Sequence, residues 1–582
     1  MAKSKVVAKS AGVPDRQAMN WLLVGGSLVT LFFWAPLTDP FNAPKSWILS
    51  ISGFWLLGWI GFNWKKFSGN KTLWIAGLLS AIYVATLFVV FVATDNKFIG
   101  MFGDYARRTG FLSYFSLTIF FLAGAYLFRL NRIEIFERVT VVVGFLLGIY
   151  GFLQHYNIDF IKWNNPYNSV LSSLGNPDFA AAAMSIFMVL NFGFILTYKK
   201  AKWVRAVAGV NVLVLLITII FAQVRQGLLA AALGIGIIVI VWIHQKQKVA
   251  AYGLTALSAV GGVAAVMGML NLGPLVKYFY KVSVTYRGDY WRAGWHMFTS
   301  HPFFGVGLDR YGAYFRVYRD ATQVARRGPD VISNATHDVP LQLASTGGIF
   351  VLLGFLALTG FIAWRGIVAL RKSSGLEQIV VATIFGAWLA YEAQSIISID
   401  NLGIAIWGWI LGGAVVGISV IEIPVEMKNA KPGSSLLQPM VSGFLGLVML
   451  VVSVLFFSAE GAMHSIQSYN IPKSGPTLTT YQYLALKPLT YGFKDPHFVV
   501  LSATMLAESG AVSTAEKNLI NLIKSDSHDV EAVDLLATVY EKTNNAGAAI
   551  PYVKDLIKLD PFNTTINTRL QKDEASASVV KK

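Results

Sequence analysis

The residues best suited to chemistry lie in one polar stretch, residues 271–347, between two strongly apolar parts of the chain. This stretch holds nine basic residues, and seven of them are arginines. Because a planar guanidinium matches two oxygens of a phosphate or carboxylate at once, an excess of Arg over Lys favours recognition of such groups. The alternative is that these side chains only contact anionic lipid headgroups. The seven are Arg287, Arg292, Arg310, Arg316, Arg319, Arg326 and Arg327.

Two further residues are candidates for a role in chemistry. His337 lies near the end of the polar stretch, and an imidazole with a pKa of about 6.5 can accept a proton at neutral pH, although a lone loop histidine usually has no such role. Arg225 lies between two apolar runs, where a charge is costly unless it faces a cavity or a partner.

Aromatic residues between Arg287 and Phe298 recur at helical spacing, which predicts an amphipathic helix lying at a membrane interface. Pro302 should end this helix, and a tight turn should follow at Gly305-Val306-Gly307.

The rest of the chain predicts a membrane protein that positions these residues. Of the 582 residues, 55% are hydrophobic and only 14% are charged, against about 25% charged in a soluble domain. Apolar runs of about twenty residues recur throughout the first 458 residues. The expected fold class is therefore all-α, a polytopic membrane helical bundle. About thirteen spans are predicted, at 20–36, 46–62, 73–93, 111–128, 139–153, 179–197, 206–222, 228–243, 249–270, 348–364, 379–399, 402–421 and 440–457.

Basic residues predict the orientation of these spans. A basic tail at 1–19 precedes the first span, and the connections that alternate with it hold, together with the tail, 21 basic residues. The connections on the other side hold six, apart from the stretch 271–347 with its nine. The positive-inside rule then places the N-terminus in the cytoplasm, and the stretch 271–347 and the C-terminal domain outside. Part of the net charge of +17 is thus orientation charge, and nucleic-acid binding is not implied.

The last part of the chain has the composition of a soluble helical domain. Residues 459–572 show self-similarity at a shift of 34, which aligns Ala503 with Ala537, Ala515 with Ala549 and Asp526 with Asp560. This period is typical of tetratricopeptide repeats, which bind protein segments or cap an assembly. A plain structural module is an equally good interpretation. The final residues, 573–582, are predicted to be a disordered tail.

Several short motifs, in order, resemble one enzyme superfamily. They are Arg107-x-x-Gly110, Gly175-Asn176-Pro177, Val224-Arg225-Gln226-Gly227, Arg287-x-x-x-Trp291-x-x-Gly294, His301-Pro-Phe-Phe-Gly-Val-Gly307 and His337-x-x-x-Leu341-Gln342 before Gly347. Together they resemble the O-antigen ligase and O-antigen polymerase superfamily, which includes bacterial protein O-oligosaccharyltransferases.

The resemblance implies a glycosyltransferase of the bacterial inner membrane. Such an enzyme moves a glycan from a polyprenyl diphosphate carrier, such as undecaprenyl diphosphate, to an acceptor hydroxyl on the extracytoplasmic face. The acceptor would be lipid A core, another glycan or a protein Ser/Thr. The resemblance assigns His337 as general base, and Arg225, Arg287 and Arg107 as ligands of the diphosphate. Asp338 is a candidate to orient His337, although adjacent side chains seldom face each other.

Direct attack by the acceptor would invert the anomeric configuration. No cofactor is expected and no metal is required, since no outside Asp-x-Asp pair is present and His296 and His301 lack metal-ligand spacing.

Two other classes stay open on the sequence. A transporter or flippase of an anionic lipid-linked substrate would use the arginines as a guide, but the predicted spans hold few ionisable residues, of which Glu392 is the clearest. A non-catalytic scaffold built on the repeats would leave the Arg and His residues unexplained.

Overall fold

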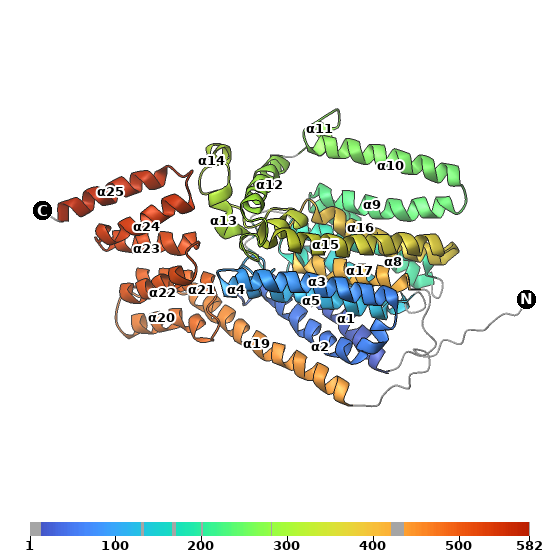
Figure 1. Ribbon diagram of the computed structural model, residues 1–582, viewed down its shortest axis with the longest axis horizontal. Coiled ribbons are helices and arrows are strands. Elements are labelled where there is room, and N and C mark those ends of the chain that lie inside the picture. Colours follow the sequence, from blue (N-terminus) through green and yellow to red (C-terminus); the bar gives the residue numbers. More distant parts are fainter. Residues whose placement is uncertain are drawn as a thin grey trace, which may run out of the picture.

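The computed structural model describes residues 13–129, 133–163, 165, 170–198, 202–280, 282–420 and 436–580, and every regular element in them is helical. Thirteen helices coincide with the thirteen predicted spans and run roughly side by side (Figure 1). They are α1 (Val13–Leu31), α2 (Asn42–Ser68), α3 (Lys71–Ala93), α5 (Phe111–Leu127), α6 (Ile133–His155), α7 (Pro177–Thr197), α8 (Lys202–Phe221), α9 (Arg225–His244), α10 (Lys248–Met269), α15 (Val339–Lys372), α16 (Gly375–Ser395), α17 (Leu402–Ile418) and α19 (Leu437–Gln467).

Eight helices in the described residues are long and apolar enough to cross a membrane, namely α3, α6, α7, α8, α9, α10, α15 and α19. The chain thus has the helices of a multi-pass membrane protein, and the count of thirteen spans stays a prediction. The first part of the predicted basic tail, residues 1–12, lies outside the described residues. So does the connection at 421–435.

Local sequence accounts for where several of these helices begin. The Asn70 side chain accepts hydrogen bonds from the backbone amides of Thr72 and Leu73 and so caps α3. Asn176 caps α7 in the same way, directly before Pro177, and Asn401 caps α17. Asn is favoured at this position because its side chain satisfies amides that have no partner within the helix.

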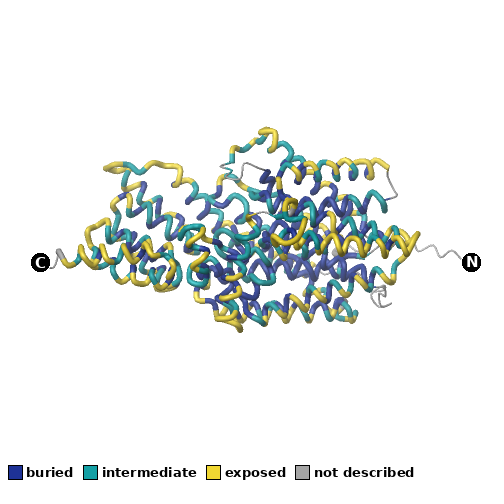
Figure 2. The backbone as a smooth tube through the Cα atoms, turned by 90° about the horizontal axis from the view of Figure 1, so that it is seen from above, coloured by how far each residue is buried: buried dark blue, intermediate teal, exposed yellow. Residues whose placement is uncertain are grey.

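Burial separates the centre of the bundle from its edge (Figure 2). Every residue of α17 is buried, and this helix packs closely on α5. A Cβ atom added at Gly413 would lie 2.3 Å from the carbonyl oxygen of Phe121, so a small residue is required where these two helices meet. Helix α10 is the opposite case, since among its residues only Ala251 and Gly268 are buried.

Several loops between helices contact one another at one end of the bundle. The alternation of the predicted spans places these loops on the same side of the membrane. The Asn42 side chain donates to the carbonyl oxygen of Ala106 over 3.2 Å, and Arg108 pairs with Glu460 over 3.1 Å. This end also carries α4 (Lys97–Phe102) and the C-terminal helices (Figure 1). The arrangement agrees with alternating spans, and the side of the membrane that this end faces stays a prediction.

Helix α19 joins the bundle to the C-terminal helices without a break. It continues to Gln467, ten residues beyond the predicted end of the last span. Its last turns bury Ala459, Met463 and Ile466 in the core of the C-terminal domain. The boundary predicted at residue 459 therefore falls inside a helix.

The C-terminal domain is a series of packed helices, α20 (Pro476–Leu486), α21 (Pro496–Glu508), α22 (Val512–Ser525), α23 (Val530–Lys542), α24 (Ala546–Leu559) and α25 (Thr565–Val580). Helices α21 and α22 form one antiparallel pair, and α23 and α24 another. The four alanines aligned by the 34-residue shift are fully buried. This fits the repeat, whose tetratricopeptide identity stays a prediction. The predicted disordered tail differs from the structure, because α25 runs through it to Val580 and packs on α24.

Candidate active site at one end of the bundle

The polar stretch 271–347 is largely helical. It contains α11 (Val276–Phe279), α12 (Val282–Ser300), α13 (Tyr311–Tyr318) and α14 (Ala321–Arg327). The predicted aromatic helix is α12, which ends at Ser300, just before Pro302. A Cβ atom at Gly294 would lie 2.7 Å from Cγ2 of Thr336, so this glycine allows α12 to approach the turn that carries His337.

The glycine motifs hold this stretch against the start of α15. The amides of Val306 and Gly307 donate to the carbonyl oxygens of Ser345 and Thr346 over 2.9 and 3.1 Å. Gly348 has a φ of 74° and kinks α15 there. A Cβ atom at Gly348 would lie 2.2 Å from the carbonyl oxygen of Phe303, so only glycine fits.

His337 lies in the turn before α15 with a φ of 58°, a conformation that residues other than glycine rarely adopt. Its Nδ1 atom lies 3.2 Å from the carbonyl oxygen of Ala335. Because a carbonyl can only accept, Nδ1 carries the proton and Nε2 is left as the basic nitrogen. The ring stacks on Tyr290 of α12 at a centroid distance of 5.0 Å. The backbone bond and the stacked ring together fix the orientation of the imidazole.

Asp338 does not orient His337. Its carboxylate accepts a hydrogen bond from the amide of Leu341 over 2.7 Å and caps α15. The turn is held instead by Gln342, whose side-chain oxygen accepts from the amide of Thr336 over 2.9 Å.

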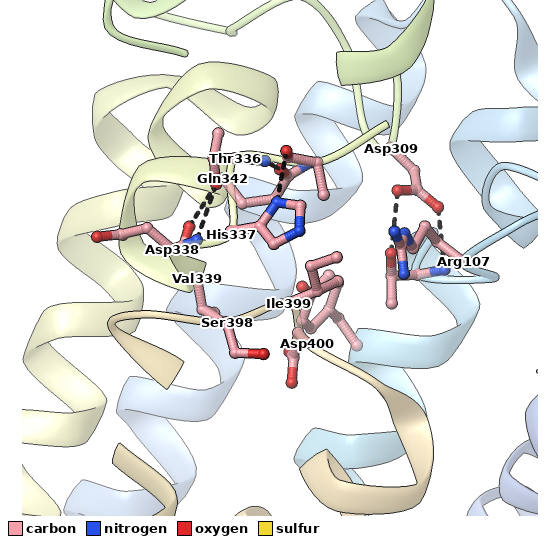
Figure 3. Close-up of a pocket in the computed structure, with 13 residues that line it drawn as sticks. Arg107, Asp309, Thr336, His337, Asp338, Val339, Gln342, Ser398, Ile399 and Asp400 are labelled. Atoms are coloured by element: carbon pink, nitrogen blue, oxygen red, sulfur yellow. Dashed lines mark hydrogen bonds between the residues drawn. The ribbon is translucent and has the colours of Figure 1, made fainter. Parts of the chain in front are cut away.

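His337 faces a small cavity with about 260 Å³ of empty space (Figure 3). Its Nε2 atom points toward the side of the cavity where Arg107 lies. Polar residues from four separate segments line the cavity, among them Arg107, Thr109, Asp309, His337, Gln342 and Asp400.

Two arginines act on His337 electrostatically. Burial, followed by the positive charges of Arg107 and Arg287, lowers the pKa of His337 to about 3. The imidazole is therefore neutral at physiological pH, and the positive potential around it is suited to an anion.

Arg287 lies on the face of α12 that meets the start of α9. It donates to the side-chain oxygen of Gln226 over 3.1 Å and lies 3.6 Å from the carboxylate of Asp178. Its side chain is only 12% exposed, and burial lowers its pKa, an effect that Asp178 partly offsets. Gln226 belongs to the motif around Arg225, and Asp178 directly follows the motif that ends at Pro177.

Arg107 reaches the site from the connection between α4 and α5. Its guanidinium donates to the side-chain oxygen of Asn334, three residues before His337. Arg107, Arg287 and His337, which are far apart in the sequence, are thus brought together. The Arg225 side chain is exposed and donates to the carbonyl oxygen of Tyr278 in α11, so it is next to Gln226 in sequence but does not line the cavity with His337.

Two buried carboxylates were missed by the sequence reasoning. Asp309 accepts hydrogen bonds from the amides of Asp104 and Thr109, which fixes the turn that presents Arg107. Burial and the nearby Asp104 raise the pKa of Asp309 to about 6. Asp400, between α16 and α17, accepts from the hydroxyl of Tyr391, and burial raises its pKa to about 6. Asp309 lies two residues after Gly307, so the Gly-Val-Gly motif is the signal that could have found it.

Five of the other six arginines of the stretch bind protein carboxylates, and Arg327 lies against aromatic rings. Arg319 of the α13 end pairs with Asp560 over 2.6 Å, Arg316 lies 3.3 Å from the same carboxylate, and Arg310 pairs with Asp526. These two aspartates are the residues that the 34-residue shift aligned. Arg292 and Arg326 pair with Asp289, and Arg327 lies over the ring of Tyr286. Of the seven arginines, Arg287 is the one whose charge acts on His337, and three, Arg310, Arg316 and Arg319, dock the C-terminal domain.

The comparison with known proteins bears on part of this site. No curated protein matches the chain. A family match covers residues 210–356, from α8 into α15, and it includes Arg225, Arg287 and His337 but neither Arg107 nor the C-terminal helices. Over these residues, the chain matches the O-antigen ligase family.

Proposed function

We propose that this protein is a membrane glycosyltransferase of the O-antigen ligase type. It transfers a glycan from a polyprenyl diphosphate, such as undecaprenyl diphosphate, to an acceptor hydroxyl on the extracytoplasmic face of a bacterial inner membrane. The observation that carries the proposal is the convergence of His337, Arg107 and Arg287 at one end of the bundle, with two of the three inside the matched span.

The arginines hold the diphosphate of the donor. Arg287 is nearly buried, and its one carboxylate neighbour among the described residues, Asp178, is itself 41% exposed and 3.6 Å away. A diphosphate next to Arg287 and Arg107 would gain charge-assisted hydrogen bonds. As the leaving group, it needs its charge neutralised more than it needs a proton, and fixed guanidinium groups supply that. The Arg225 side chain lies against α11, and from there it would contact the outer part of the lipid carrier.

His337 removes the proton from the acceptor hydroxyl through Nε2. In the free protein it is a weak base, because burial and two positive charges depress its pKa. When the diphosphate binds, its negative charges offset those of the arginines, so the pKa of His337 rises toward the useful range near neutrality. Binding of the donor thereby makes His337 a stronger base.

In the reaction, the acceptor oxygen forms a bond to the anomeric carbon as the bond to the diphosphate oxygen breaks. The hydroxyl proton passes to His337, and the electron pair of the broken bond leaves with the lipid diphosphate. A single displacement inverts the anomeric configuration, and no step needs a metal. The acceptor is lipid A core, a glycan or a protein Ser/Thr.

The test is a transfer assay with the purified protein. A polyprenyl diphosphate oligosaccharide is supplied with each class of acceptor, and both free lipid diphosphate and glycosylated acceptor are measured. We expect the two products in equal amounts and with inverted anomeric configuration. Movement of intact donor across a vesicle membrane, without cleavage, would instead identify a flippase.

A further inference from the structure

A second, larger cavity lies between the C-terminal domain and the bundle end. It has about 1010 Å³ of empty space. One wall of this cavity is formed by the first turns of α21 and α23 and by the turn before α23. The opposite wall is formed by α13 and by the segments around Tyr105 and Asn334.

This cavity adjoins the one that contains His337. Asn334 lines the larger cavity, and its side-chain oxygen accepts a hydrogen bond from Arg107, which lines the smaller one. Asn334 and His337 are three residues apart, so their Cα atoms are within about 11 Å of each other. The two cavities are therefore neighbours, with the hydrogen-bonded side chains of Arg107 and Asn334 between them.

The lining combines aromatic planes with polar groups. The ring of His497 stacks on Tyr105 at 4.1 Å, and the ring of His528 stacks at 4.3 Å on Tyr314, which lies outside the lining. The buried hydroxyl of Tyr105 has no hydrogen-bond partner among the described residues. Glu531 is exposed at the edge of the cavity and forms no ion pair within the described part of the chain.

A sugar fits this lining better than a peptide. Sugar rings present C–H faces, which pack on flat rings, and hydroxyl groups, which donate to carboxylates and accept from tyrosine, guanidinium or imidazole. A peptide bound as an added strand needs a free sheet edge, and the described residues contain no strand.

We propose that this cavity binds an oligosaccharide chain as the acceptor, so that the C-terminal domain forms half of the acceptor site. This inference rests on the proposed function and goes beyond it by naming the acceptor class and its binding site. It gives the external helical domain a direct role in a reaction between glycans.

The test uses the full-length protein in detergent and two variants, Glu531→Gln and His497→Ala. The probe is the free oligosaccharide released from the donor by mild acid. Its binding is measured by saturation-transfer NMR without donor, and its KM as acceptor is measured at saturating donor. Glu508→Gln, at the far end of α21 and outside the cavity lining, is the matched control.

We expect both variants to weaken binding of the oligosaccharide and to raise its KM by about tenfold, while the KM for the donor stays within about twofold of wild type. Wild-type affinity in both variants would overturn the acceptor site and leave the proposed function standing. Use of a Ser/Thr peptide in place of the oligosaccharide, with its KM raised by the same variants, would overturn the acceptor class. Oligosaccharide binding that depends on Glu531, without any donor cleavage, would support the site and refute the proposed function.

Discussion

The C-terminal domain should depend on the Asp560 carboxylate for its docking on the bundle end. Asp560 is 1% exposed and is shared by Arg319, which is fully buried, and Arg316, which is 21% exposed. The substitution Asp560→Asn keeps the shape of the side chain and removes its charge. Arg319 would then be a buried cation without its counter-ion, and breaking such a pair typically costs about 3 to 5 kcal/mol.

This loss of free energy should weaken the docking of the C-terminal domain and leave the stability of the helical bundle unchanged. Hydrogen exchange measured by mass spectrometry on the purified protein should show faster exchange in α13, α14 and α24, with α17 unchanged. If undocking is the opening event, a loss of about 3 kcal/mol raises its equilibrium constant by about two orders of magnitude.

The matched control is Asp555→Asn on the same helix, α24. Asp555 is 51% exposed and pairs with Lys558 at the surface, and such pairs contribute less than about 1 kcal/mol. The double variant Asp560→Asn with Arg319→Met removes the unpaired charge, so it should recover part of the loss. The reasoning fails if Asp560→Asn exchanges like Asp555→Asn, or if the double variant is no better than the single one.

Three further predictions concern the site. Arg287→Lys keeps the charge but loses the guanidinium fork, so the rate of transfer at limiting donor should fall about tenfold or more. A rate equal to that of wild type would show that Arg287 does not bind the diphosphate. The pH profile of kcat/KM reports the free enzyme and should show no loss of activity through His337 between pH 7.5 and 5.5, because the pKa of His337 lies near 3. The profile of kcat reports the donor complex, in which the pKa of His337 is raised, so kcat should begin to fall at a higher pH. If kcat and kcat/KM fell at the same acidic pH, activation by the donor would be contradicted. Gly348 has a positive φ, and Gly348→Ala places a Cβ atom 2.2 Å from the carbonyl oxygen of Phe303, so this variant should have both a lower melting temperature and a lower activity. The control variant Gly360→Ala adds a Cβ atom with no other atom within 4 Å and should change neither property.

Local patterns in the sequence predicted much of this molecule. Apolar runs of membrane length located the thirteen helices, and the aromatic spacing after Arg287 located α12, because both features depend on residues close in the chain. The capping role of Asp338 was also open to prediction, since an Asp two residues before a proline is a common helix start.

Partners distant in sequence could not be found in this way. Asp560 lies 241 residues from Arg319, so nothing near the arginine indicated that it docks a domain rather than binds phosphate. The side chain of Arg225 is directed by the packing of α11, which its local motif does not encode. The C-terminal tail follows the same principle, because α25 is ordered by its packing on α24.

The most direct test of the proposed chemistry is the single-turnover rate of His337→Gln with donor bound. Glutamine can keep a hydrogen bond but cannot accept a proton at neutral pH, so the rate of glycan transfer should fall by about 10² to 10⁴ while donor affinity stays near that of wild type. His296→Gln, an exposed histidine of α12 outside the cavity, should transfer at the wild-type rate. Transfer by His337→Gln at the rate of His296→Gln would contradict the assignment of His337 as the base.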